Sequence, residues 1–241
     1  MLLLSLDFET TGLDKQKDRI TEVGMCLWST TFGRAMETAS YFVDCELPIS
    51  KEVSDITGIT APMLKKFGRS EVDAIEDVVY LANKADAVIG QNVIQFDKHF
   101  LDNAGKRLNI VIPEKLWIDT RTDLPPQVES KSLSYMAADH GFLNPFPHNA
   151  VADALTVLKI VALYDIDEIV KRAKEPVLVV RAHQKFDDNH LAKKLKFGFK
   201  ANLGKAWLKV IKQSDLPQLT KDAAFDISVE KDITPQQVWY D

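Results

Sequence analysis

Apolar residues alternate with other residues near the start of the chain, in the two-residue period of a β-strand. The alternation predicts a strand that begins at residue 2 and ends in a turn at residues 10–12. One face of this strand would carry Leu2, Leu4, Leu6 and Phe8. The other face would carry Leu3, Ser5, Asp7 and Glu9. Two similar runs follow at 19–28 and 35–43, with a turn at 31–34, so the sequence predicts a β-meander.

Helical and strand patterns alternate after the meander. Residues 70–83 and 96–108 have a helical period, whereas 87–90 and 116–119 are short apolar runs typical of buried strands. Two further helices are predicted at 132–140 and 149–164. This order predicts an α/β domain over residues 1–174, in which helices flank a mixed five-stranded sheet.

The pattern changes near residues 174–176, where we expect a domain boundary. Strands are predicted at 177–181 and 225–229, a short helix at 188–195, and one or two strands between 198 and 211. Residues 175–241 are therefore expected to form a small, basic, β-rich module of α+β type.

Asp7 and Glu9 would lie side by side at the end of the first strand. Two carboxylates that close repel each other, and an apolar strand of this kind is expected to be buried. A hard divalent cation would allow both groups to stay ionised. The alternative is an ordinary exposed strand end that runs into the turn at residues 10–12.

Three later residues favour the metal site. Asp97 lies in the apolar run 88–97, a strand that breaks into a helix, and His148 lies five residues before Asp153. Taken singly, each acid has an ordinary explanation, because the first turn of a helix favours a negative charge. Taken in order, the segments LDFETTG (6–12), GQNVIQFD (90–97) and HNAVAD (148–153) resemble the DEDDh (DnaQ-like) family of 3′–5′ exonucleases, over residues 1 to about 165.

The resemblance implies an RNase H-like exonuclease fold and hydrolysis of phosphodiester bonds from the 3′ end. It also implies two Mg²⁺ ions, for which Mn²⁺ would substitute. The metal ligands would be Asp7, Glu9, Asp97 and Asp153. Asp7 would bridge both ions, and His148 would be the general base, a role suited to an unperturbed histidine pKa of ~6.5. Products would be nucleoside 5′-monophosphates, with DNA the expected substrate.

The turn after the first strand is expected to contact the terminal nucleotide. Thr10, Thr11 and Gly12 would let the backbone approach the substrate, since glycine has no Cβ. By resemblance, Leu13 would pack against the last base, and Asn92 would contact substrate or support Asp97.

Charge is divided unevenly along the chain, whose net charge is −5. Residues 171–241 contain 14 Lys or Arg and 9 Asp or Glu, against 16 and 26 in residues 1–170. A basic module suits a phosphate backbone. We expect a nucleic-acid grip formed by Lys193, Lys194, Lys196 and Lys200. The alternatives are that these lysines are only a solvated surface or bind a replication or repair protein, and that the interleaved aromatic residues form the module's core.

Composition limits the remaining possibilities. Hydrophobic residues make up 46% of the chain, as in globular proteins, and no run of 18 apolar residues predicts a membrane span. The opening MLLLSL lacks a preceding basic region and is interpreted as a core strand, so a cytoplasmic protein is expected. Cys26 and Cys45 are the only cysteines, and we expect two buried free thiols.

Three rival functions stay open. The same chemistry could act on RNA, as in RNase T or oligoribonuclease-like enzymes. An RNase H-like endonuclease or strand-transferase would share the carboxylates. A non-catalytic nucleic-acid-binding or clamp-associated module would keep the fold alone, although the full set of acids and the histidine speaks against it.

Overall fold

The chain forms two compact units, residues 1–173 and 174–241, in a computed structural model that describes residues 1–128 and 132–240. In the first unit the strands are β1 (Leu2–Thr10), β2 (Ile20–Ser29), β3 (Arg34–Phe42), β4 (Ala87–Gly90) and β5 (Leu116–Asp119). The helices are α1 (Lys51–Thr57), α2 (Ala61–Phe67), α3 (Glu71–Lys84), α4 (Asp97–Leu108), α5 (Leu133–Asp139), α6 (Ala150–Val161) and α7 (Ile166–Ala173).

One mixed sheet organises the first unit, in the order β3-β2-β1-β4-β5. The β1/β2 and β2/β3 pairs are antiparallel, and the β1/β4 and β4/β5 pairs are parallel. The predicted α/β class and mixed five-stranded sheet are therefore confirmed. The central position of β1 explains its apolar sequence, because both of its faces are covered.

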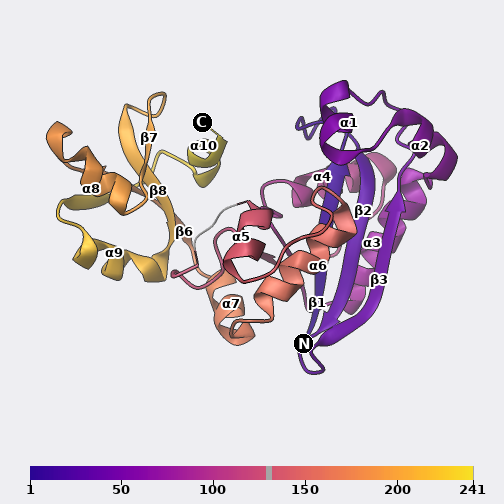
Figure 1. Ribbon diagram of the computed structural model, residues 1–241, viewed down its shortest axis with the longest axis horizontal. Helices are drawn as coiled ribbons and strands as arrows, with labels where there is room; N and C mark the ends of the chain where they lie inside the picture. Colours follow the sequence, from indigo (N-terminus) through magenta and orange to yellow (C-terminus); the bar gives the residue numbers. More distant parts are fainter. Residues whose placement is uncertain (129–131, 241) are drawn as a thin grey trace. The chain divides into compact units, whose positions relative to one another are not determined.

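The two faces of β1 enter different clusters, as the alternation predicts. Leu4, Leu6 and Phe8 pack with side chains of α3 and α4. Leu3 packs with side chains of α5, α6 and α7 on the opposite face. The unit thus has three layers, with the sheet between two groups of helices (Figure 1). Asp7 and Glu9 belong to the α6 face.

Three helices of the first unit, α1, α2 and α7, have no counterpart in the sequence prediction. α1 buries no residue and α2 buries only Leu64, so neither has the apolar stripe that predicts a helix. Their ends are instead set by local hydrogen bonds. Ser50 caps α1 by accepting from the Val53 N–H, and Gly58 ends it in the left-handed conformation.

Gly24 lets α6 approach the sheet. A Cβ at position 24 would lie 2.0 Å from the carbonyl carbon of Ala150, at the first residue of α6. A second contact lies deeper, where the Ser5 hydroxyl donates to the Ala154 carbonyl at 2.8 Å. The start of α6 is therefore held against β1 and β2.

Gly24→Ala should destabilise the protein by ~1–3 kcal/mol, because backbone must move to admit the methyl group. Urea denaturation would measure the change. Gly198→Ala is the matched control, since a Cβ there would meet its nearest atom at 3.8 Å. Equal stability of the Gly24 variant and the wild type would contradict this close packing.

The second unit contains an antiparallel sheet in the order β7-β8-β6-β9. Its strands are β6 (Val177–His183), β7 (Gly198–Lys200), β8 (Ala206–Lys212) and β9 (Asp226–Glu230). Its helices are α8 (Asn189–Lys194), α9 (Leu216–Asp222) and α10 (Pro235–Tyr240), with 3₁₀ turns at Phe186–Asp188 and Gln213–Asp215. The short helix near residue 190 was predicted, whereas α9 and α10 were not.

Aromatic residues of the second unit divide between core and surface. Phe197 is buried and contacts Phe225, whereas Phe199 is 51% exposed and lies against Trp207. The core explanation therefore holds for Phe197 and not for Phe199.

Two smaller observations concern the cysteines and the length of the helices. Both cysteines are free, but only Cys26 is buried, because Cys45 follows the end of β3 and is partly exposed. Among the described residues, no helix is long and apolar enough to cross a membrane.

Candidate active site

Strand β1 carries two acids to the start of α6. Asp7 pairs with Gly24 of β2, and Glu9 pairs with Glu22. Because residues directly opposite on antiparallel strands share a face, Glu9 and Glu22 point to the same side of the sheet. The prediction that Asp7 and Glu9 lie near each other on one face agrees with this register.

Asp97 joins this region from the opposite layer. It is the first residue of α4 and is only 2% exposed. Its Oδ1 accepts a hydrogen bond of 2.8 Å from the Phe8 N–H, in the strand between Asp7 and Glu9. Burial raises the pKa of Asp97 well above its usual value, although the Phe8 bond opposes the rise.

Asp153 and His148 come from the entry to α6. The His148 N–H donates to Oδ2 of Asp153 at 3.1 Å, and the Asn144 amide donates to Oδ1. His148 has a φ of 62°, a left-handed conformation that is uncommon outside glycine. Asn149 follows as the N-cap, and its side chain accepts from the Ala152 N–H at 3.2 Å.

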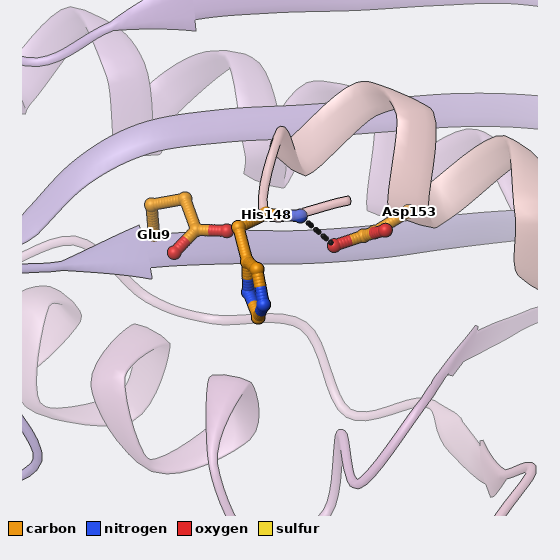
Figure 2. Close-up of side chains that lie close together, drawn as sticks. All are labelled: Glu9, His148 and Asp153. Carbon is orange, nitrogen blue, oxygen red and sulfur yellow. Dashed lines mark hydrogen bonds between the residues drawn. The ribbon is translucent and has the colours of Figure 1, made fainter. Parts of the chain in front are cut away.

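Glu9, His148 and Asp153 form a candidate metal-holding group. Each offers a ligand atom, and these atoms lie within 4.8 Å of one another. Figure 2 shows the strand supplying Glu9, with the loop and first turn of α6 supplying the other two. The structure therefore brings Glu9 together with two residues that lie 139 and 144 positions later in the sequence, as a compact O/N donor set.

The remaining acids are linked to this group by electrostatics. Burial, and then the charges of Asp97, Asp153, Glu9 and Glu22, raise the pKa of Asp7 well above its usual value. Burial first, and then Asp153 and Glu22, raise the pKa of Glu9 to about 8. Five carboxyl groups thus oppose one another's ionisation. A divalent cation fits such a site, because its charge would favour the ionised form of every one of them.

The turn after β1 is held by its own side chains. The Thr10 hydroxyl donates to the Gly12 carbonyl at 2.6 Å, and the Thr11 hydroxyl donates to Asp18 at 2.8 Å. A Cβ on Gly12 would lie 2.5 Å from the Asp18 carboxylate, so the glycine makes room for that side chain. Leu13 is 81% exposed beside this turn. Contact of these residues with a nucleotide stays a prediction.

Asn92 has a structural place in the loop before α4. It has a φ of 59°, its N–H donates to Asp119 at 2.9 Å, and its carbonyl accepts from the Phe96 N–H at 3.0 Å. Its side-chain oxygen accepts from Arg121 at 2.8 Å. These bonds shape the loop that leads to Asp97.

Glu22 and Asp119 are two buried acids that the sequence prediction did not assign to the site. Glu22 accepts from the Asn149 amide at 2.7 Å and from the Ala150 N–H at 3.3 Å. Asp119 accepts from the N–H groups of Asn92 and Ile94, and burial raises its pKa to about 6. A charged residue within a largely apolar strand was the only sequence signal for Glu22.

A family comparison agrees with the site. The family model described as "Exonuclease" (RNase_T) matches residues 4–161. The chain belongs to this exonuclease family. This confirms the resemblance to DEDDh exonucleases, which are 3′–5′ exonucleases that act on nucleic acid. The matched range begins in β1 and ends in α6, and so includes every acid of the cluster.

A curated relative points the same way. A PolC-type DNA polymerase III of Thermotoga maritima is 31% identical over 170 residues, which cover 69% of this chain. The match spans only 12% of that polymerase. The similarity therefore concerns a segment of the polymerase and not its whole length.

Solved structures share the fold at low identity. E. coli exonuclease I in complex with a dT13 oligonucleotide matches 98% of this chain and 67% of its own, with a TM-score of 0.63 and 13% identity. The nuclease domain of 3′hExo, a DEDDh family member bound to rAMP, matches 67% of this chain and 90% of its own, with a TM-score of 0.57 and 18% identity. The RNase H-like exonuclease fold is thus confirmed.

Proposed function

We propose that this chain is a metal-dependent 3′–5′ exonuclease that removes nucleoside 5′-monophosphates from DNA. The observation that carries the proposal is the meeting of Glu9, His148 and Asp153 within 4.8 Å, beside the carboxyl groups of Asp7 and Asp97. A cluster of acids with raised pKa values in one place is typical of a functional site. Membership of the exonuclease family supplies the reaction class.

Asp7, Glu9, Asp97 and Asp153 would hold the metal, and Mg²⁺ suits them because it prefers oxygen ligands. Two such ions, when bound, would stabilise charge on the phosphate oxygens and activate a water. His148 would accept the proton of the attacking water. Its backbone bond to Asp153 fixes the position of the loop, while its exposed side chain stays accessible to substrate and solvent.

DNA is preferred because the matched relative is a DNA polymerase and exonuclease I was solved with a DNA oligonucleotide. The exoribonuclease alternative rests on 3′hExo, which was solved with rAMP. Matched DNA and RNA oligomers labelled at the 5′ end, incubated with Mg²⁺, would separate the two. A ladder that shortens one nucleotide at a time on DNA is expected. Faster shortening of RNA would favour the alternative, internal cuts would indicate an endonuclease, and an uncut strand would indicate a binding module.

The second unit is proposed to grip the nucleic acid away from the cut. Of the nine basic residues between 181 and 212, Lys209 and Lys212 donate to backbone carbonyls of Leu195 and Glu175 and are not free for phosphate. Lys193, Lys194 and Lys196 are exposed, and Lys200 is partly exposed. The Lys193 ammonium lies 5.8 Å from the ring centre of Trp207, which is itself beside exposed Phe199. Cationic and aromatic groups together suit a single strand. A protein partner at this surface is the alternative.

Replacing these four lysines with alanine in the full chain should weaken binding to a long single strand. If each contacts one phosphate, the slope of log K against log salt should fall by about 3 units. The rate on a saturating short oligomer should hardly change. Lys221→Ala with Lys231→Ala is the control, since both lysines are exposed in the same unit. Equal salt slopes for the quadruple variant and the wild type would show that these lysines do not contact phosphate, and that the surface is only solvated or binds a protein partner.

A further inference from the structure

Glu22 holds the entry of α6 in place from the neighbouring strand. It is 3% exposed and lies within β2. Each of its two carboxylate oxygens has a separate donor at the entry to α6. Oε1 accepts from the Asn149 amide at 2.7 Å, and Oε2 accepts from the Ala150 N–H at 3.3 Å. Both donors belong to the residues that directly follow His148.

Asn149 connects this contact to the site. Its Nδ2 donates to Glu22, while its Oδ1 accepts from the Ala152 N–H and caps α6. The Asn149 carbonyl also accepts from the Asp153 N–H at 3.0 Å. The orientation of the Asn149 side-chain amide thus sets the distance of the loop from β2 and caps the first turn of α6. The backbone of the same residue holds the backbone of Asp153.

We infer that Glu22 is a positioning residue for His148 and Asp153, an inference that rests on the proposed exonuclease function. Glu22 would act through Asn149 and Ala150 and not on the substrate. It holds the loop against β2 at the place where Gly24 removes the Cβ that would push α6 away. His148 has an uncommon left-handed φ, and such a conformation persists where surrounding contacts determine it.

The donor and acceptor pattern makes the inference testable by exchange. In Glu22→Gln, one oxygen can still accept from the Ala150 N–H, but the new amide faces the Asn149 amide. If Asn149 keeps its orientation, its amide N–H₂ faces the new amide N–H₂ at position 22. If Asn149 turns over, its N–H₂ faces the Ala152 N–H instead. In Asn149→Asp, a carboxylate faces the Glu22 carboxylate. The double variant restores all three pairs, because the glutamine amide at position 22 can donate to one aspartate oxygen at position 149. The glutamine oxygen then accepts from the Ala150 N–H, and the second aspartate oxygen accepts from the Ala152 N–H, with the charge moved from position 22 to position 149.

We expect each single variant to lower kcat by ~10- to 100-fold, the usual cost of losing a group that orients a metal ligand. The double variant should recover most of that loss. Glu52→Gln, on the exposed face of α1, is the charge-matched control and should keep the wild-type rate. A double variant as slow as the product of the two single effects would overturn the inference. So would single variants with wild-type kcat.

Hydrogen–deuterium exchange without metal gives a second measurement that does not depend on activity. Peptides covering residues 148–153 should exchange faster in Glu22→Gln than in the wild type, while peptides from the centre of α3 stay unchanged, and the double variant should restore protection. Uniformly faster exchange would indicate loss of global stability and would overturn a positioning role. A wild-type protein that cuts no strand but shows the local exchange pattern would refute the proposed function and leave the Glu22 contact standing.

Discussion

Replacing Asp7 with alanine should remove nearly all nuclease turnover and leave the protein folded. Asp7 lies on the central strand between acids from both helical layers. Burial, and then the charges of Asp97 and Asp153, raise its pKa. Because Asp7 lies between acids of α4 and α6, its loss should remove metal binding as well as turnover. We expect less than a tenth of the wild-type rate in a 5′-labelled oligomer assay with Mg²⁺.

The same substitution should preserve or increase the stability of the protein when metal is absent. A carboxyl group whose folded pKa is raised binds protons more tightly in the folded state, so folding is favoured at low pH and loses stability as pH rises through the folded pKa. Asp7→Ala removes that loss. In EDTA at pH 8, its Tm should equal or exceed that of the wild type, and the difference should shrink at pH 5. Added Mg²⁺ should raise the Tm of the wild type and not of the variant.

Glu76→Ala is the control for both measurements, because Glu76 is exposed in α3 and lies outside the cluster. It should keep the wild-type rate and the wild-type response to Mg²⁺. Retention of more than a tenth of the rate by Asp7→Ala would contradict the assignment of Asp7. A variant that loses Tm in EDTA at pH 8 would contradict the raised pKa of Asp7, because it would show that the ionised carboxylate does not destabilise the metal-free protein.

Alternation along β1 was enough to predict which residues share a face, because a strand covered on both sides shows its period directly in the sequence. The order of strands and helices predicted the mixed sheet, because a meander of three strands pairs antiparallel whereas strands joined through helices pair parallel. Helices such as α3, with a buried stripe, were predicted, while α1 and α2 were not, since they bury almost nothing. The ends of these short helices are set by local capping. A capping residue can be recognised in a sequence only when the helix beside it has a recognisable apolar pattern.

The site divides in the same way. Asp7, Glu9, Asp97, His148 and Asp153 could be proposed from their order and motifs. For Glu22 the sequence offered only a charge within an apolar run. Its role could not be predicted, because its contacts with Asn149 and Ala150 join positions more than 120 residues apart and depend on how closely α6 approaches β2. That approach depends on Gly24, whose role is visible only once the helix is in place. Asp119 was hidden similarly, since its partners belong to the loop before α4.

His148→Gly should lower kcat by ~10²-fold or more, the usual cost of a lost general base, with little change in substrate affinity. Glycine is the informative replacement, because His148 has a φ of 62°, which glycine adopts without strain and alanine does not. The backbone bond from residue 148 to Asp153 can therefore persist while the imidazole is removed. His148→Ala should lose at least as much activity, and the difference between the variants measures the cost of the backbone conformation.

Imidazole added to His148→Gly separates a base from a metal ligand or a spacer. The position is exposed, so a free imidazole can reach the space that the side chain leaves. We expect partial recovery of kcat that increases with the concentration of neutral imidazole and is absent in the wild type. The acidic limb of the wild-type pH–rate profile should also be lost in the variant. A variant that keeps this limb unchanged, and gains nothing from imidazole, would show that another group takes the proton from water and that His148 serves the site through its backbone alone.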